Sequence, residues 1–114
     1  MNIVVQGTKE FSDYNVFLRA MGVALSDIDD GEFNLYSVGP ANINSFTAEF
    51  CNLSENSLKQ RGIKARYYKV PASFIEKNMK DFHYFAFLST SNQRPSKLVA
   101  SAELEGIDVG LFRY

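Results

Sequence analysis

Short apolar runs alternate along the chain with longer segments in which apolar residues recur at helical spacing. The apolar runs predict β-strands at residues 2–6, 33–38, 63–70, 82–88 and 107–114. Apolar residues three or four positions apart predict helices that begin near residues 13, 43, 72 and 96. Strands that alternate with helices are typical of a parallel sheet covered on both faces. The pattern therefore predicts an α/β fold.

The composition of each predicted strand indicates its place in the sheet. Strands 2–6 and 82–88 have continuous apolar runs at 3–5 and 84–88, which favours the centre, whereas strand 63–70 alternates basic residues with apolar or aromatic ones and the last strand contains Arg113. Right-handed crossovers then favour the order 3-2-1-4-5 over 2-1-3-4-5, which would bury the half-polar third strand. We expect an open, five-stranded, three-layer Rossmann-like sheet.

The ends of the predicted helices carry recognisable signals. Ser12 or Asp13 can cap the first helix, and Ser73 with Glu76 has the spacing of a capping box in the third. Gly62 follows the second helix as a C-terminal glycine. The apolar stripes of the first two helices consist of Tyr14, Phe17, Leu18, Met21, Ala24 and Leu25, and of Ile43, Phe46, Phe50, Leu53 and Leu58.

Composition narrows the class of protein. The 114 residues fit one domain, 1–114, and the hydrophobic content of 46% excludes disorder. The net charge of -1 gives no overall attraction to nucleic acid or membranes. The single cysteine, Cys51, suits a reducing compartment, no apolar run approaches the roughly 20 residues of a membrane span, and Gln6 and Lys9 interrupt the start too early for a signal peptide. We expect a cytoplasmic protein without a membrane partner.

Ligands of open α/β sheets bind beyond the carboxyl ends of the strands, where the predicted loops are 7–13, 39–44, 71–73 and 89–95. These loops are longer than those at the opposite edge, and three helix N-termini point toward them. A glycine directly after a strand either lets a ligand approach the backbone or makes a tight turn. Hydroxyl, amide and cationic groups can bind phosphate and ribose, although capping and turn formation favour the same residue types. The candidates are Gly7, Thr8, Lys9, Gly39, Asn42, Asn44, Ser89, Thr90, Ser91, Asn92 and Arg94.

Two stretches of the chain resemble a known family. Residues 7–14, GTKEFSDY, resemble the opening G-x-R-x-F-x-D-Y of small stand-alone proteins of the SLOG superfamily, which includes the DprA/Smf proteins and the lonely-guy phosphoribohydrolases. The segments RGI at residues 61–63 and VPASF at 70–74 are similar to the "R-G-I" and "P-A-x-W" run of that family. The resemblance covers roughly residues 2–75 and also suggests a protein encoded by a bacteriophage, acting in the host cytoplasm.

The resemblance implies binding of a nucleotide or nucleotide-derived signal across residues 7–11 and 39–44, often in a homodimer. We expect no cofactor and no metal. It adds Phe11 and Pro40 to the candidate ligand-binding residues. The chain has one glycine where the family has a pair, and it lacks the P-G-G-x-G-T-x-x-E motif of the phosphoribohydrolases. We therefore expect binding rather than catalysis. An enzyme of this kind would cleave an N-glycosidic bond, with Glu49 as its acid or base.

Other residues support alternative interpretations. Seven of the twelve Lys and Arg residues lie within residues 59–80, where Glu76 is the one acid. With Tyr67 and Tyr68 among them, this segment is either a groove for single-stranded nucleic acid or an edge strand protected by lysines. A protein-interaction module is a further possibility. His83 is interpreted as a hydrogen-bonded core or boundary residue, because it lies within an apolar strand, and Cys51 as a packing residue, because it has no histidine or second thiol at metal or triad spacing.

Overall fold

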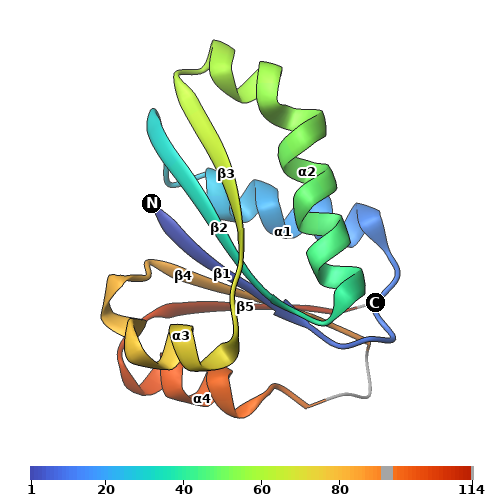
Figure 1. Cartoon of the computed structure of the whole chain (residues 1–114), viewed down its shortest axis with the longest axis vertical. Helices are drawn as coiled ribbons and strands as arrows, with labels where there is room; N and C mark the ends of the chain where they lie inside the picture. Colours follow the sequence, from blue (N-terminus) through green and yellow to red (C-terminus); the bar gives the residue numbers. More distant parts are fainter. Residues whose placement is uncertain (91–93, 114) are drawn as a thin grey trace.

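The sheet runs through the middle of the molecule, with helices on both of its faces (Figure 1). The computed structural model describes residues 1–90 and 94–113. Within that part of the chain the sheet has five parallel strands in the order β3-β2-β1-β4-β5. This confirms the predicted α/β class and strand order. The strands are β1 (Asn2–Gly7), β2 (Gly31–Gly39), β3 (Ile63–Lys69), β4 (Tyr84–Ser89) and β5 (Asp108–Arg113). The predicted strand end at Tyr114 lies outside the described residues.

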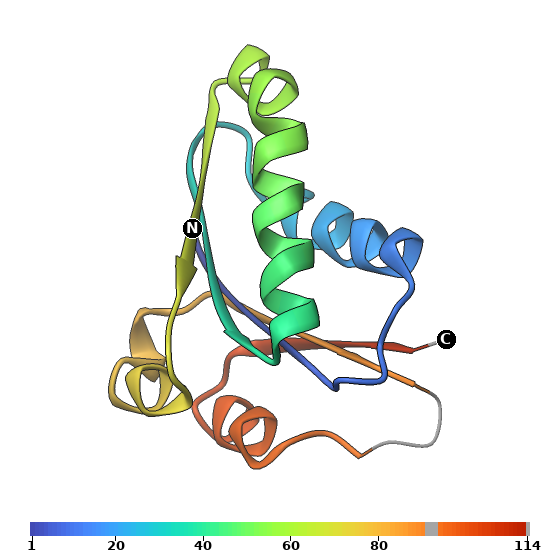
Figure 2. The same cartoon turned by 45° about the vertical axis from the view of Figure 1, so that its right-hand side comes forward.

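Helices cover the two faces of the sheet in pairs (Figure 2). Helices α1 (Tyr14–Leu25) and α2 (Ala41–Gln60) lie on one face, called here the α1–α2 face. Helices α3 (Ala72–Lys77) and α4 (Lys97–Leu104) lie on the other, the α3–α4 face, and a 3-10 helix, η1 (Met79–Asp81), joins α3 to β4. Across the described residues, no helix is long and apolar enough to cross a membrane.

The core has two layers, because successive side chains of a strand point to opposite faces. Ile3 and Val5 pack with α1 and α2 in one apolar cluster, whereas Val4 and Phe85 pack with α3 and α4 in the other. Ile3, Val4 and Val5 are each 0% exposed. The continuous apolar run at the start of the chain is thus explained by burial on both faces of the sheet.

The ends of the first two helices agree with the sequence signals. Asp13, rather than Ser12, caps α1: its Oδ1 accepts hydrogen bonds from the backbone N–H of Asn15 at 3.0 Å and of Val16 at 3.2 Å. Gly62 follows the end of α2 with φ +75°. This left-handed conformation carries no steric penalty for glycine, so the chain can turn directly into β3.

The capping box predicted for the third helix is wrong. Helix α3 begins at Ala72, with Pro71 as its N-cap and no side-chain capping hydrogen bond. Ser73 is therefore already inside the first turn and cannot occupy the N-cap position that the motif requires. Its spacing from Glu76 has no capping role.

Two leucines assigned to the apolar stripes are exposed. Leu18 is 41% exposed and Leu53 is 68% exposed. The buried stripe of α2 passes through Phe50 and Cys51 to Leu58. Because an α-helix turns roughly 100° per residue, Leu53 lies roughly 60° around the helix from Phe50, outside the buried stripe, and is exposed to solvent.

The amino-terminal parts of β2 and β3 extend beyond the rest of the sheet, with α2 lying along them (Figure 1). On the α3–α4 face of this extension, the side chains are polar and at least partly exposed: Glu32 and Asn34 on β2, and Lys64 and Arg66 on β3. The sheet therefore has one stretch of surface that neither α3 nor α4 covers.

Candidate functional site

The turns that follow β1 and β2 lie side by side at the carboxyl edge of the sheet. Gln6 of β1 pairs with Gly39 of β2, after a shift in register that follows Val5. The backbone N–H of Thr8 donates to the carbonyl oxygen of Leu88 at 3.0 Å, which ties the first loop to β4 as well. The turns at Gly7 and Gly39 are therefore neighbours, at the edge where ligands of open α/β sheets bind.

Gly7 is required by packing within this edge. A Cβ atom at Gly7 would lie 2.6 Å from the carbonyl oxygen of Leu88 and 2.7 Å from Cδ1 of Ile43. The space that a side chain at residue 7 would fill is therefore already taken up by an isoleucine from the first turn of α2. The glycine allows α2 to pack closely against β1, and this packing alone explains the residue.

Phe11 belongs to the core. It is 1% exposed, and its ring meets that of Phe46 edge-on, with centroids 6.0 Å apart and an interplanar angle of 80°. The loop after β1 thus carries a large apolar anchor of its own. A side chain in this position holds the loop against α1 and α2 and has almost no surface left for a ligand.

Asn42 fixes the same loop through its polar side chain. Its Nδ2 donates to the carbonyl oxygens of Thr8 at 3.1 Å and of Phe11 at 2.8 Å. Both amide hydrogens are thereby used on the backbone of residues 8–11. Asn42 positions the loop relative to the start of α2, which is a different role from the ligand contact predicted for it.

The turn after β2 has a defined shape. Gly39 has φ +101°, and its peptide bond to Pro40 is cis. The Asn44 side chain lies over the glycine, with its Nδ2 3.6 Å from the position of a Cβ atom. Its Oδ1 accepts a hydrogen bond from the Ser37 hydroxyl. A side chain at Gly39 would have room, but the backbone conformation strongly favours glycine.

The N-terminus of α2 is exposed at this edge and has no side-chain cap. Its N-cap residue is Pro40, which makes no side-chain capping hydrogen bond, and both Pro40 and Ala41 are exposed. The helix has 20 residues. The N–H groups at the start of such a helix, together with its macrodipole, favour an anion.

A second group of polar side chains lies across the edge, next to α4. The Ser96 hydroxyl donates to Gln6 Oε1 at 2.6 Å and accepts from the backbone N–H of Val99 at 3.4 Å, which caps α4. Ser89 is 1% exposed, and its Oγ has no hydrogen-bond partner within residues 1–90 and 94–113. A buried hydroxyl without a partner is unfavourable, but at 1% exposure the Ser89 side chain is as little accessible to a ligand as that of Phe11.

The remaining candidates lie at the rim of this edge. Lys9 and Arg94 are exposed, and Thr90 is half-buried. Ser91 and Asn92, which the sequence also suggested, lie outside the described residues.

Glu49, the candidate acid or base, lies away from the edge. It is exposed and is eight residues beyond Ala41, which corresponds to about 12 Å along the helix axis. Burial, followed by the nearby Glu49 carboxylate, raises the pKa of Tyr14. Glu49 thus acts electrostatically on the start of α1, and its distance from the N-terminus of α2 argues against a role beside a phosphate bound there.

Cys51 is unsuited to nucleophilic chemistry. The residue is buried, and this burial raises the pKa of its thiol from 9.0 to about 11. The thiolate population of the folded protein near pH 8 is then roughly 100-fold below that of an unperturbed thiol. Because the folded pKa lies above the unfolded one, the associated stabilisation is present below pH ~9 and is lost as the pH rises toward 11.

We expect iodoacetamide to alkylate Cys51 at pH 8 roughly 100-fold more slowly in the folded protein than in protein unfolded in urea. Mass spectrometry over a time course measures both rates. Rates within about threefold of each other would show that the thiol is not protected by the fold.

His83 has a structural role at the opposite edge. It lies just before β4, and its Nδ1 accepts a hydrogen bond from the backbone N–H of Asn2 at 3.0 Å. No group of three or more His, Cys, Asp and Glu side chains suited to a metal ion occurs among the described residues.

Two depressions of the surface lie away from the carboxyl edge. One lies between the end of α2 and the start of β3 and is lined by Glu55, Lys59, Gly62, Ile63, Lys64 and Ala65. The other, of about 250 Å³, lies beside α3 and η1 and is lined by Asn2, Tyr36, Phe74, Asn78, Asp81 and Phe82. Neither includes a residue from the predicted ligand site.

The two tyrosines of the basic segment point to opposite faces of the sheet. Tyr67 packs against the α1–α2 cluster. Tyr68 is 36% exposed and stacks on Tyr36, its partner in the β2–β3 register. Sequence reasoning missed Tyr36 and the nearby Phe74, because the pairing of strands decides which rings meet.

Comparison of the chain with protein-family models, with curated proteins and with solved structures finds no match.

Proposed function

We propose that the protein binds a nucleotide or a nucleotide-derived small molecule at the carboxyl edge of the sheet. The observation that carries the proposal is the exposed N-terminus of α2, which has no side-chain cap and lies beside the Gly39 turn. A phosphate group would accept hydrogen bonds from the N–H groups of Ala41 and Asn42 and would be favoured by the helix dipole.

Other groups at the edge would complete such a site. Lys9 and Arg94 would contribute positive charge from either side. Gly7, Phe11 and the Asn42 side chain would support the loop from below. The resemblance of residues 7–14 to the SLOG opening motif points to the same ligand class.

The proposal is for binding without catalysis, because Glu49, the candidate acid or base, lies about 12 Å along the helix axis from the N-terminus of α2. A homodimer and a role in sequestering a signalling nucleotide, both suggested by the family resemblance, belong to this proposal as well. Neither is needed for the test that follows.

Ala41→Asp provides a specific test. An aspartate in the first turn should stabilise the unliganded fold by about 0.3–1 kcal/mol through the helix dipole, yet its carboxylate would repel a phosphate. Thermal unfolding would be measured with ADP, GTP, ADP-ribose and cyclic di-AMP, each tested alone. We expect at least one to raise the Tm of the wild type, since binding at 100 times the Kd adds about 2.7 kcal/mol, and we expect Ala41→Asp to lose this rise.

Asn56→Asp is the matched control, because it adds the same charge at an exposed position farther along the same helix. It should keep the ligand-dependent rise in Tm. The proposal fails if no ligand in the panel raises the Tm, or if Ala41→Asp and Asn56→Asp respond equally. Gly39→Val is less suitable, because the φ of +101° would strain any β-branched residue.

A further inference from the structure

Three aromatic side chains form a row on the α3–α4 face of the sheet, at its β3 side. Tyr36 lies in the middle: its ring is stacked on Tyr68, with centroids 4.8 Å apart, and on Phe74 of α3, with centroids 6.0 Å apart. The interplanar angles are 18° and 16°. Tyr68, Tyr36 and Phe74 are called here the aromatic row.

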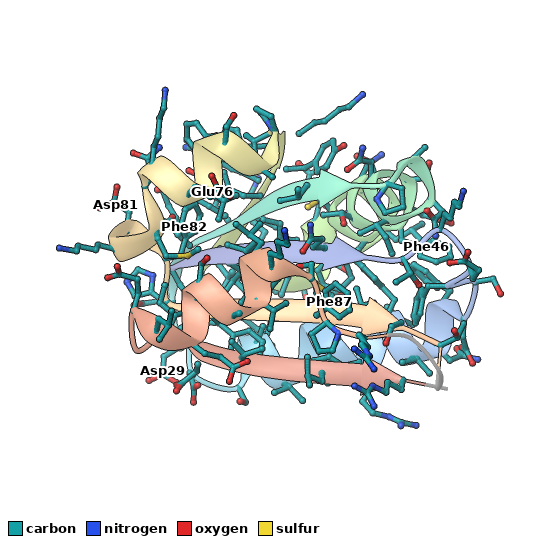
Figure 3. The ribbon with its side chains drawn as sticks, turned by 90° about the horizontal axis from the view of Figure 1, so that it is seen from below. Asp29, Phe46, Glu76, Asp81, Phe82 and Phe87 are labelled. Atoms are coloured by element: carbon teal, nitrogen blue, oxygen red, sulfur yellow. The ribbon has the colours of Figure 1, made fainter. Side chains whose placement is uncertain are left out.

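The row is supported from inside the molecule and open to solvent at its ends. Phe82 meets Tyr36 edge-on at 5.1 Å, and Figure 3, which looks onto this face, shows Phe82 beside α3 and η1. Tyr68 is 36% exposed and Phe74 is 40% exposed. Because β3 is an edge strand of the sheet that residues 1–90 and 94–113 form, no further strand of that sheet covers the outer side of Tyr68, and a planar group can add to the stack there.

Positive charge accompanies the row. Lys64 and Arg66 share a face of β3 with Tyr68, because residues two apart on a strand point the same way. Arg66 pairs with Glu32 at 3.1 Å, and a side-chain hydrogen bond with Tyr68 together with this carboxylate raises the pKa of Arg66. The guanidinium is therefore held next to the aromatic row.

The positive charge is concentrated in the segment of the chain that contains β3 and α3. Residues 59–80 contain seven Lys and Arg residues and one acid, and of the three cations on β3, Lys64 and Arg66 lie on the face of the aromatic row, whereas Lys69 lies on the opposite face. The depression of about 250 Å³ beside Phe74 adds the side chains of Asn2, Asn78 and Asp81. The amides of Asn2 and Asn78 already donate to the carbonyl oxygens of Asp81 and Phe74, at 3.0 Å and 2.8 Å, so the Asp81 carboxylate is the group of the three best placed to pair with the edge of a nucleobase.

From this arrangement we infer a second binding site, in which the aromatic row and the cations of β3 bind single-stranded nucleic acid. Unpaired bases stack on aromatic side chains, and the phosphates between them pair with Lys and Arg. A duplex hides its bases from such a surface, so the site selects single strands. It lies on the opposite face of the sheet from α2 and is independent of the proposed nucleotide site.

Fluorescence anisotropy tests the inference with labelled 12-nucleotide single strands of mixed sequence, one of DNA and one of RNA, in 50 and 200 mM salt. We expect the wild type to bind at least one strand, and Tyr68→Ala to weaken this binding roughly tenfold through the loss of one stacked base. Tyr68→Phe keeps the ring but loses the hydroxyl that hydrogen-bonds to Arg66, so it should bind more tightly than Tyr68→Ala. The logarithm of the binding constant should fall less steeply with the logarithm of the salt concentration for Arg66→Ala than for the wild type. The difference in slope should be roughly 0.7, the value for one phosphate contact in a single strand.

Two variants serve as matched controls. Arg19→Ala removes an exposed arginine from α1, on the other face of the sheet, and Ala41→Asp alters only the proposed nucleotide site. Both should bind the oligonucleotide as the wild type does. Circular dichroism establishes that every variant is folded.

Three results would overturn the inference. The first is no binding at 50 mM salt. The second is a failure of the variants to differ: Tyr68→Ala binds the strand as tightly as the wild type, or Arg66→Ala loses no more affinity than Arg19→Ala. The third is equally tight binding of the corresponding duplex. Sedimentation adds a further check, because weaker self-association of Tyr68→Ala than of the wild type would show that a second copy of the chain covers the row instead.

Discussion

Phe11→Ala is expected to lower the free energy of unfolding by about 3–5 kcal/mol, the usual cost of truncating a buried phenylalanine. Phe11 is 1% exposed, and its ring packs edge-on against Phe46. The cavity would open beneath the loop after β1, so the loop would lose its apolar anchor. Urea unfolding followed by circular dichroism gives the change.

Phe74→Ala is the appropriate comparison, because Phe74 is 40% exposed and its truncation should cost less than half as much. The family resemblance predicts that Phe11 contacts a ligand, so the variant also separates two roles. A Phe11→Ala protein that unfolds at the wild-type urea concentration but no longer responds to a nucleotide would place Phe11 in the ligand site and contradict its structural role.

Gly7→Val is expected to destabilise the protein by about 3 kcal/mol, at the upper end of the usual cost of overpacking. The new Cβ would lie 2.6 Å from the Leu88 carbonyl oxygen, which already accepts a hydrogen bond from Thr8 at 3.0 Å. A backbone oxygen in the central strands cannot move aside easily. The contact with Ile43 Cδ1, at 2.7 Å, would push α2 away from β1. Thermal and urea unfolding measure the loss.

The control at a second glycine should change stability in the opposite direction. Gly22 lies within α1, and a Cβ atom added there would have nothing within 4 Å of it, so Gly22→Ala should stabilise the protein by about 0.4–1 kcal/mol. Equal stability of Gly7→Val and the wild type would show that the carboxyl edge can expand, and that the glycine is not required by packing.

The fold could be predicted because the apolar or polar composition of each strand indicates how far that strand is buried in the sheet. Residues 3–5 are apolar at every position since both faces of β1 are covered, whereas β3 alternates because it lies at an edge. These two patterns, with the handedness of crossovers, were sufficient for the strand order. The position of the loops at one edge followed from the same topology.

The roles of single residues at that edge could not be predicted in the same way. Gly7 is constrained by Ile43, and the Asn42 amide is used by the backbone of residues 8–11. Such contacts join segments more than thirty residues apart and leave no local pattern. Phe11 precedes the periodic part of α1, so no helical stripe indicated its burial.

The contacts within the aromatic row could not be predicted from the sequence either. Tyr67 and Tyr68 are adjacent in the sequence and equally aromatic, yet only Tyr68 meets Tyr36. A shift of the β2–β3 register by one residue would exchange their faces. The alternation of Ile63 and Ala65 with Lys64 and Arg66 assigns the two tyrosines to faces, but it does not indicate that Tyr68 lies opposite Tyr36 of β2.

The central place of β1 also has a consequence for synthesis on the ribosome. A nascent chain that has emerged as far as Val70 carries β1, β2 and β3 with both of their covering helices, but one side of β1 stays unpaired until residues 84–89 arrive as β4. During that interval the central strand offers bare backbone N–H and C=O groups to any other extended chain nearby. Translation speed between residues 70 and 90 would therefore govern how much newly made protein is lost to aggregation.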